Sequence, residues 1–143
     1  MKVREVMSSR VRQISSSAMI SEAADRMKTL HVGMLPVVEN KDIVGTISER
    51  DIVVRAVSAG MNPRTTPVRE VMTAGAVCCS AEDDVEGAAG IMEEKHARRL
   101  VVLDPDNTAI GILSVGDLVP GAGDAHLTYQ VIERICESVR TDS

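Results

Sequence analysis

The sequence is almost devoid of aromatic side chains. Its 143 residues include one tyrosine, Tyr129, and no phenylalanine or tryptophan. The core is therefore expected to consist of Val, Ile, Leu, Met and Ala side chains. Because single-stranded nucleic acids are bound largely by stacking of bases on aromatic rings, this composition argues against such a partner.

Basic runs and long apolar runs are also missing. The formal net charge is −5, so binding to a duplex by neutralising its phosphates is not expected. No apolar run approaches the length of a bilayer span, and the N-terminal residues MKVREVMSSRVRQ lack the apolar segment of a secretory signal. The cysteines Cys78, Cys79 and Cys136 are odd in number and do not form a disulfide framework. We expect a soluble, cytoplasmic protein that binds no nucleic acid and no membrane.

One pentapeptide, VREVM, occurs twice, at residues 3–7 and 68–72. The match extends along the chain at an offset of 65 residues, which becomes 66 after a longer turn at residues 104–108. The equivalent pairs include Met27 and Met92, His31 and His96, Gly45 and Gly111, and Asp51 and Asp117. The sequence therefore predicts two copies of one unit, residues 1–64 and 65–120, followed by a tail, residues 121–143.

Each copy predicts the order strand, helix, strand, strand, helix. The expected strands are residues 13–14, 35–38 and 43–47 in the first copy and 77–79, 100–103 and 109–113 in the second. Helices are expected from Ile20 to Leu30, from Ser48 towards Gly60, and over residues 85–92, the last with a capping box of Ser80 and Asp83. One copy is too small to bury both faces of its sheet, so we expect an α+β fold in which two copies form a pseudo-twofold pair.

The tail predicts one more helix, over residues 124–139. Its apolar side chains recur every four residues, at Leu127, Val131, Ile135 and Val139. Such a stripe requires an apolar partner surface, either on the same module or on a second chain.

Several of these features together resemble the CBS domain, a family that occurs as tandem pairs called Bateman modules. They are the two VREVM segments, the EAAxxM-type helix at residues 22–27, LPVV at 35–38 and GTISERD at 45–51. The resemblance runs from Val3 to about Val119. It implies a stand-alone regulatory pair of CBS units that forms a homodimer and acts on an unknown effector protein. It also implies that AMP, ATP or another adenosyl compound binds in the cleft between the units, with no cofactor required.

The two Ser-x-x-Asp motifs are the leading candidates for a ligand site. Each lies where a strand turns into a helix, whose first N–H groups and dipole favour a phosphate. The family resemblance assigns ribose to Asp51 and Asp117 and places Ser48 and Ser114 near the ribose or phosphate. Adenine would be read mainly by backbone groups. The resemblance places these groups near Ile14, Pro36 and Cys78.

Both motifs also have a purely structural interpretation, because [ST]-x-x-[DE] at a helix start is a capping box that needs no ligand. The first motif contains Arg50, whereas the second contains Gly116 and is soon followed by Pro120. The second copy also has Val101 in place of Pro36. These differences favour the first motif as the better ligand site.

Arg98 and Arg99 precede the strand at residues 100–103, where a guanidinium could bind a phosphate through two hydrogen bonds. The alternative is a solvated pair facing Glu93 or Glu94. The first copy has Gly33 and Met34 at these positions, so a single nucleotide per chain is one hypothesis.

Catalytic and metal-binding signatures are weak. His31, His96, His126 and Cys136 lack a compact ligand spacing, and we expect the first two histidines to end helices instead. Of Cys78 and Cys79, at least one should face the core. No nucleophile–base pair or phosphate-binding glycine loop is recognisable, so we expect neither an enzyme nor a native metal site. The alternatives to a nucleotide sensor are an interaction protein whose motifs are only caps and a nucleotide-processing enzyme.

Overall fold

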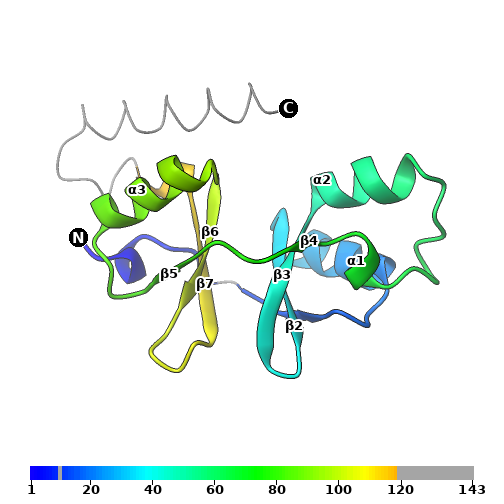
Figure 1. Cartoon of the computed structure of the whole chain (residues 1–143), viewed down its shortest axis with the longest axis horizontal. Coiled ribbons are helices and arrows are strands. Elements are labelled where there is room, and N and C mark those ends of the chain that lie inside the picture. Colours follow the sequence, from blue (N-terminus) through cyan, green and yellow to red (C-terminus); the bar gives the residue numbers. More distant parts are fainter. Residues whose placement is uncertain (10, 119–143) are drawn as a thin grey trace. The chain divides into compact units, whose positions relative to one another are not determined.

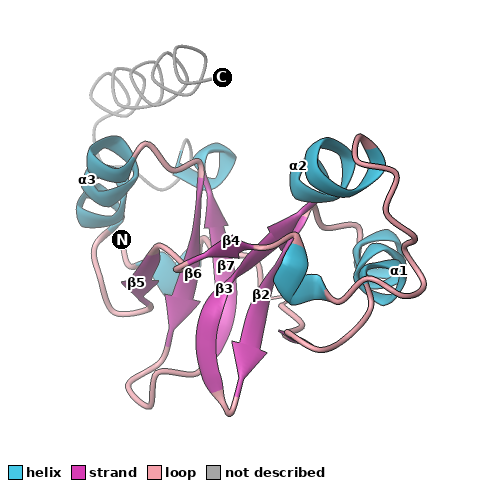
Figure 2. Ribbon diagram, turned by 45° about the vertical axis from the view of Figure 1, so that its right-hand side comes forward, coloured by secondary structure: helices cyan, strands magenta, loops and turns pink. Residues whose placement is uncertain are grey.

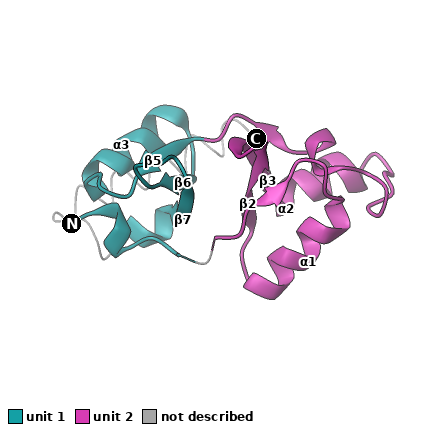
Figure 3. Cartoon of the chain, turned by 90° about the horizontal axis from the view of Figure 1, so that it is seen from below, with its two compact units in different colours: residues 1–9, 77–143 teal, residues 10–76 magenta. Residues whose placement is uncertain are grey.

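The chain folds into two compact units of mixed α+β structure, coloured separately in Figure 3. The computed structural model describes residues 1–9 and 11–118 (Figure 1). Unit 2 is Arg10–Ala76, and unit 1 joins Met1–Ser9 to the chain from Val77 onward. The helix predicted over residues 124–139 lies outside the described residues.

Unit 2 contains a four-stranded sheet with the order β1-β2-β3-β4. The strands are β1 (Ile14–Ser15), β2 (Met34–Glu39), β3 (Asp42–Ser48) and β4 (Thr73–Ala74). β1 is parallel to β2, while β2 and β3 form an antiparallel hairpin and β4 pairs antiparallel with β3. Helix α1 (Ile20–Leu30) connects the two parallel strands, as the helical spacing of Ile20, Ala23 and Met27 predicts.

Unit 1 repeats this pattern with three strands, visible as magenta arrows in Figure 2. They are β5 (Cys78–Ser80), β6 (Arg99–Leu103) and β7 (Ala109–Ser114), and helix α3 (Val85–Lys95) connects the first two. β5 is parallel to β6, and β6 and β7 form the antiparallel hairpin. The predicted order of strands and helices in each copy is confirmed.

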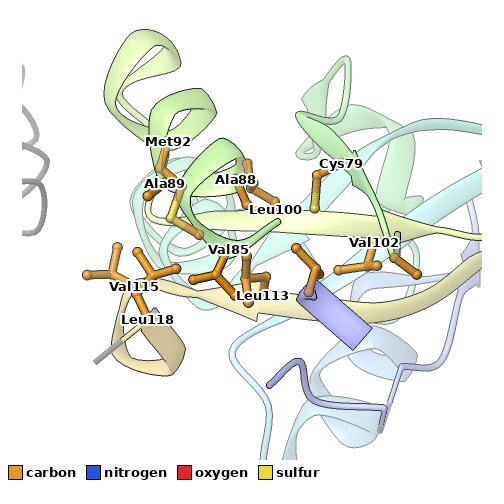
Figure 4. Close-up of a cluster of buried hydrophobic side chains, with 12 residues drawn as sticks. Cys79, Val85, Ala88, Ala89, Met92, Leu100, Val102, Leu113, Val115 and Leu118 are labelled. Atoms are coloured by element: carbon orange, nitrogen blue, oxygen red, sulfur yellow. The ribbon is translucent and has the colours of Figure 1, made fainter. Parts of the chain in front are cut away.

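Each unit has its own apolar core. In unit 1, Val85, Ala88 and Met92 of α3 pack against Leu100 and Leu113 of the hairpin, as Figure 4 shows. In unit 2 the corresponding cluster is Ile14, Ile20, Ala23, Met27, Leu35, Val37, Ile47, Ala56, Val68 and Val71. Both cores are aliphatic, as the composition predicts.

The two VREVM segments each belong to the unit built mainly from the other repeat. The backbone N–H of Val3 donates to the carbonyl of Asp83 (2.9 Å), and the N–H of Val68 donates to that of Ala18 (2.7 Å). Asp83 and Ala18 are 65 residues apart, as Val3 and Val68 are. The two repeats therefore exchange their VREVM segments, and each segment binds at the equivalent position of the other repeat. Figure 1 shows the N-terminal segment, in blue, beside β5. The compact units therefore do not follow the repeat boundaries at residues 64 and 65.

Both repeats begin the exchanged segment with a short 3-10 helix, η1 (Val3–Glu5) and η3 (Val68–Glu70). The valine that opens each of them is completely buried in the core of the unit it joins. Burial of this valine is the apolar contribution that holds each exchanged segment in place.

The helix that follows β3 differs from the prediction. The expected continuous helix begins as α2 (Glu49–Asp51) and continues as a π-helix, η2 (Ile52–Val57). The predicted stop at Gly60 is a turn with φ of +69°. In unit 1 the corresponding element is a 3-10 helix, η4 (Val115–Leu118).

The predicted capping box at Ser80 is wrong. Asp83 accepts a hydrogen bond from the Ser80 N–H (2.9 Å), but this bond closes a turn, because α3 starts two residues later, after Asp84. The helix ends are as predicted in position: His31 and His96 close α1 and α3 in the left-handed conformation, with φ of 56° and 54°.

Candidate functional site

In unit 2 the Ser-x-x-Asp motif forms a complete capping box at the start of α2. The Ser48 N–H donates to Oδ2 of Asp51 (2.9 Å), and the Asp51 N–H donates to Oγ of Ser48 (3.1 Å). This reciprocal pair satisfies two backbone donors at the helix start. The structural interpretation of the motif is therefore realised here, whether or not a ligand also binds.

Asp51 has two further partners, Thr73 and Arg55. Its Oδ1 accepts a hydrogen bond from Oγ1 of Thr73 on β4 (3.1 Å) and lies 3.6 Å from Nη1 of Arg55. The residue is 8% exposed. The aspartate is thus buried and surrounded by donors from three parts of unit 2.

In unit 1 the second motif is organised differently. Oδ2 of Asp117 accepts both from the Ser114 N–H (2.8 Å) and from the Ser114 hydroxyl (3.0 Å). Because both bonds end on one oxygen, Oδ1 of Asp117 has no hydrogen-bond partner among the described residues. Asp117 is also only half-buried, whereas Asp51 is buried.

The helix starts do not offer the open set of N–H groups that a phosphate would need. The N–H of Glu49 donates to the carbonyl of Gly33 (3.0 Å), and that of Asp51 is taken by Ser48. In unit 1 the N–H of Val115 donates to the carbonyl of Arg98 (3.0 Å). Three of the N–H groups at the two helix starts therefore already have acceptors within the protein.

The arginines differ between the units. In unit 1, Arg99 lies directly opposite Ser114 in the β6–β7 ladder, whereas in unit 2 the residue opposite Ser48 is Met34. Side chains of directly opposed residues share one face of the sheet, about 5 Å apart at Cβ. The Cβ atom of Arg99 therefore lies next to that of Ser114, which binds Asp117. Both Arg99 and its neighbour Arg98 are exposed. In unit 2 the arginine of the motif, Arg50, is exposed.

The residues expected near adenine lie on the strands. Ile14 pairs with Val37 and is 1% exposed, so only its backbone is available to a ligand. Pro36 is buried in β2, and Cys78 pairs with Val101 in the other unit. The predicted residues of unit 2 are Ser48, Arg50, Asp51, Ile14 and Pro36, and those of unit 1 are Arg98, Arg99, Ser114, Asp117 and Cys78.

Thr73 and Arg55 are the residues of this region that sequence reasoning missed. Arg55 follows Asp51 by four residues, a spacing that favours an ion pair on a helix and was available as a signal. Thr73 reaches Asp51 only because β4 pairs with β3, placing Thr73 opposite Thr46. No local pattern indicates that pairing.

The adjacent thiols do not have the features of reactive cysteines. Cys79 is buried in the core of unit 1, which confirms that one of the pair faces inward. Its burial, together with the nearby Asp83 and Cys78, raises its pKa to about 12. Burial also raises the pKa of Cys78. Both thiols are therefore protonated and poorly nucleophilic near neutral pH.

Within residues 1–9 and 11–118, no three or more His, Cys, Asp or Glu side chains gather as metal ligands would. Among those residues no helix is long and apolar enough to cross a bilayer.

Comparison with known proteins places the chain in a family. The model of the CBS domain matches it twice, at residues 3–58 and 68–120, so the chain belongs to the CBS domain family. It is 36% identical over 116 residues to the CBS domain-containing protein YhcV of Bacillus subtilis, covering 81% of each chain. The tandem CBS pair predicted from the repeats is thereby confirmed.

Solved structures agree with this assignment. A conserved CBS domain protein of unknown function from Thermoplasma acidophilum, TA0289, is similar with a TM-score of 0.81 and 27% identity, over 99% of this chain and 77% of that one. The CBS-pair protein CBSX2 of Arabidopsis thaliana in complex with AMP is similar with a TM-score of 0.67 and 25% identity, over 90% and 98% of the two chains. The α+β fold of two CBS units is that of these proteins.

Proposed function

We propose that this protein is a regulatory module that binds an adenine nucleotide or a related adenosyl compound. The similarity to CBSX2, which was crystallised with AMP, supports a ligand of this class. The proposed binding residues are those named from the sequence in each unit, with a motif aspartate as the ribose acceptor and the arginines as phosphate donors. Binding would act on an effector protein by favouring one conformation of the module over another.

The observation that carries the proposal is the arrangement of Arg99, Ser114 and Asp117. Ser114 fixes the Asp117 carboxylate through one oxygen and leaves the other available. A carboxylate in this state can accept hydrogen bonds from the vicinal hydroxyls of a ribose. Arg99 lies opposite Ser114 in the β6–β7 pair. Its guanidinium can bind a phosphate through two hydrogen bonds. A carboxylate next to a cation is the pairing that a nucleoside phosphate requires.

Isothermal titration of the nucleotide-free protein with AMP, ATP, NAD and S-adenosylmethionine tests the proposal. We expect saturable binding of at least one, weakened about 10-fold or more in Asp117→Asn and in Arg99→Ala through the loss of charge-assisted hydrogen bonds. Arg64→Ala, which removes an exposed arginine from a loop of unit 2, is the control and should bind normally. The absence of heat with all four compounds would reject a nucleotide sensor.

A role without ligand is the second candidate, and the Ser48–Asp51 capping box favours it for the first motif. If both motifs were only caps, substitution of either aspartate would lower stability by about 1 kcal/mol and change no ligand response. Incubation with ATP or AMP should yield no product, because a regulatory module binds the nucleotide without converting it.

We also propose that the protein is a homodimer formed through the helical surface of unit 2. Val53, Val54 and Val57 of η2 are 59%, 50% and 66% exposed. Such exposure is unusual for three apolar side chains on one short helix. Val53 also lines an open groove of about 390 Å³ beside α1 and α2, to which Lys28 and Glu49 contribute charges of opposite sign. A twofold axis would bring each charge to its opposite on the second copy, so this surface is complementary to itself.

We propose a cytoplasmic location, since Cys78 and Cys79 are thiols.

A further inference from the structure

The two Ser-x-x-Asp motifs occupy equivalent positions but differ in what surrounds the carboxylate. We propose that they have divided their roles: Asp51 is a latch that fastens residues 71–73 to unit 2, and Asp117 alone accepts the ribose of the ligand. The chain therefore binds one nucleotide, at the unit 1 motif. This inference rests on the proposed function and specifies which of its two motifs carries it.

The distribution of hydrogen bonds over the two oxygens of each carboxylate supports this division. On Asp51 both oxygens already accept one, Oδ2 from the Ser48 N–H and Oδ1 from Oγ1 of Thr73. Nη1 of Arg55 lies 3.6 Å from Oδ1 as an ion-pair partner. A ribose would have to share these two oxygens with the protein donors, on a residue that is only 8% exposed. On Asp117 both protein bonds end on Oδ2, and Oδ1 remains for a ligand among the described residues.

Arg55 shows what the Asp51 cluster holds in place. Its Nη1 donates to the carbonyls of Val71 (3.1 Å) and Met72 (2.8 Å), while the same atom faces Asp51. The next residue, Thr73, donates to Asp51 directly. Three consecutive residues are thus tied to one aspartate–arginine pair, immediately before the chain leaves unit 2 at Ala76. The pair fastens the exchanged segment at the end opposite to the buried Val68.

The second copy lacks the parts of this latch. At the position equivalent to Arg55 the sequence has Gly121, which lies outside the described residues and has no side chain to contribute. Conversely, the arginine that faces Ser114 in unit 1 is replaced by Met34 in unit 2. Arg55 and Arg99 therefore lie on different elements, η2 in unit 2 and β6 in unit 1. Arg55 donates to two backbone carbonyls of unit 2.

Titration of the full chain with AMP distinguishes the two roles through a matched pair of substitutions. We expect one AMP per chain. Asp51→Asn should keep the wild-type Kd within about 3-fold, and Asp117→Asn should weaken it about 10-fold or more. Two AMP molecules per chain, or an equal loss of binding in Asp51→Asn, would overturn the division of roles while leaving the proposed function intact. If AMP does not bind, the same pair of variants is titrated with whichever of ATP, NAD and S-adenosylmethionine does, and no binding of any of the four by the wild-type chain would reject both.

A second measurement, the melting temperature without ligand, tests the latch directly. It can be made even if Asp51→Asn binds too little AMP to titrate. Thr73→Val and Arg55→Gln each remove one arm and should lower the melting temperature by about 2–5 °C, with Arg64→Gln as the neutral control. Because Thr73 and Asp51 share one hydrogen bond, Thr73→Val combined with Asp51→Asn should lower it by less than the sum of the two single effects. Strict additivity would overturn the latch.

Discussion

Gly45 lies directly against the backbone of Thr73. A Cβ atom built on Gly45 would overlap the carbonyl oxygen of Thr73 and lie 3.2 Å from its carbonyl carbon. The equivalent glycine of the second repeat, Gly111, meets the end of the other exchanged segment, since its Cβ would lie 2.9 Å from the carbonyl oxygen of Ser8. The glycine that opens each GxxSxxD motif is therefore required for the close approach of the exchanged segment to the sheet.

Gly45→Ala should destabilise the protein by about 1–3 kcal/mol, because two backbones must move apart. Gly111→Ala should cost less than Gly45→Ala, since one of its contacts is the flexible side chain of Met7. Gly87 on α3 has open space around its Cβ position, and Gly87→Ala should be neutral or stabilising by up to about 1 kcal/mol. Urea unfolding of the three variants measures the differences. A Gly45→Ala variant as stable as the wild type would contradict the close approach.

The two buried valines of the exchanged segments should matter equally. Val3 and Val68 are each 0% exposed, and Val3→Ala and Val68→Ala should each lower the free energy of unfolding by about 2 kcal/mol. Val57→Ala, at a position that is 66% exposed, should change it by less than about 0.5 kcal/mol in the monomer. Urea denaturation curves provide the measurement. A neutral Val3→Ala would mean that the N-terminal segment is not bound to unit 1.

Stability should fall in alkaline solution because of Cys79. The thiol has a pKa of about 12 in the folded chain and about 9.0 when unfolded, so its contribution is complete below pH 9 and is lost as the pH rises towards 12. At pH 10 the loss is on the order of 1 kcal/mol relative to pH 8. Unfolding free energies at both pH values, for the wild type and Cys79→Ala, isolate the effect. Identical pH dependence in the two proteins would show that Cys79 is not the cause.

Val57→Glu should separate the proposed dimer. A carboxylate at the centre of an apolar twofold contact is repelled by its own copy and is costly to desolvate. Sedimentation velocity should show dimer for the wild type and monomer for the variant, with an unchanged circular dichroism spectrum. Glu70→Gln, on an exposed position of η3, is the control and should remain a dimer. A dimeric Val57→Glu protein would place the contact elsewhere.

The spacing of apolar residues predicted the helices and strands, because each helix or strand must turn the same face towards the core in both repeats. Ile20, Ala23 and Met27 are buried on one face of α1 as their spacing requires, and the hairpins fall within one or two residues of their predicted ends. The π-helix was not predictable, since no residue pattern distinguishes it from an α-helix. The exchange of the VREVM segments was not predictable either, because two identical pentapeptides fit both sheets equally well.

Asp51 and Asp117 were predicted to have the same role because they belong to equivalent motifs. The motifs do not show that different residues surround the two carboxylates. The second motif was expected to be the weaker site, on account of Gly116 and Pro120. The structure instead gives it the carboxylate oxygen without a hydrogen-bond partner among the described residues. What separates the motifs is Thr73, which reaches Asp51 across a strand pairing between residues far apart in the chain. Contacts of that kind depend on the assembled sheet.

The reciprocal exchange has a consequence for how such a chain could arise by duplication. In a chain made of a single repeat, the Val3 segment would have no Asp83 carbonyl to receive its N–H, and the core that receives Val68 would stay open. In an unduplicated chain the same exchange can form only between two molecules, as a segment-swapped dimer. Joining two such molecules end to end converts an intermolecular swap into an intramolecular one. Assembly of the two halves then no longer depends on protein concentration.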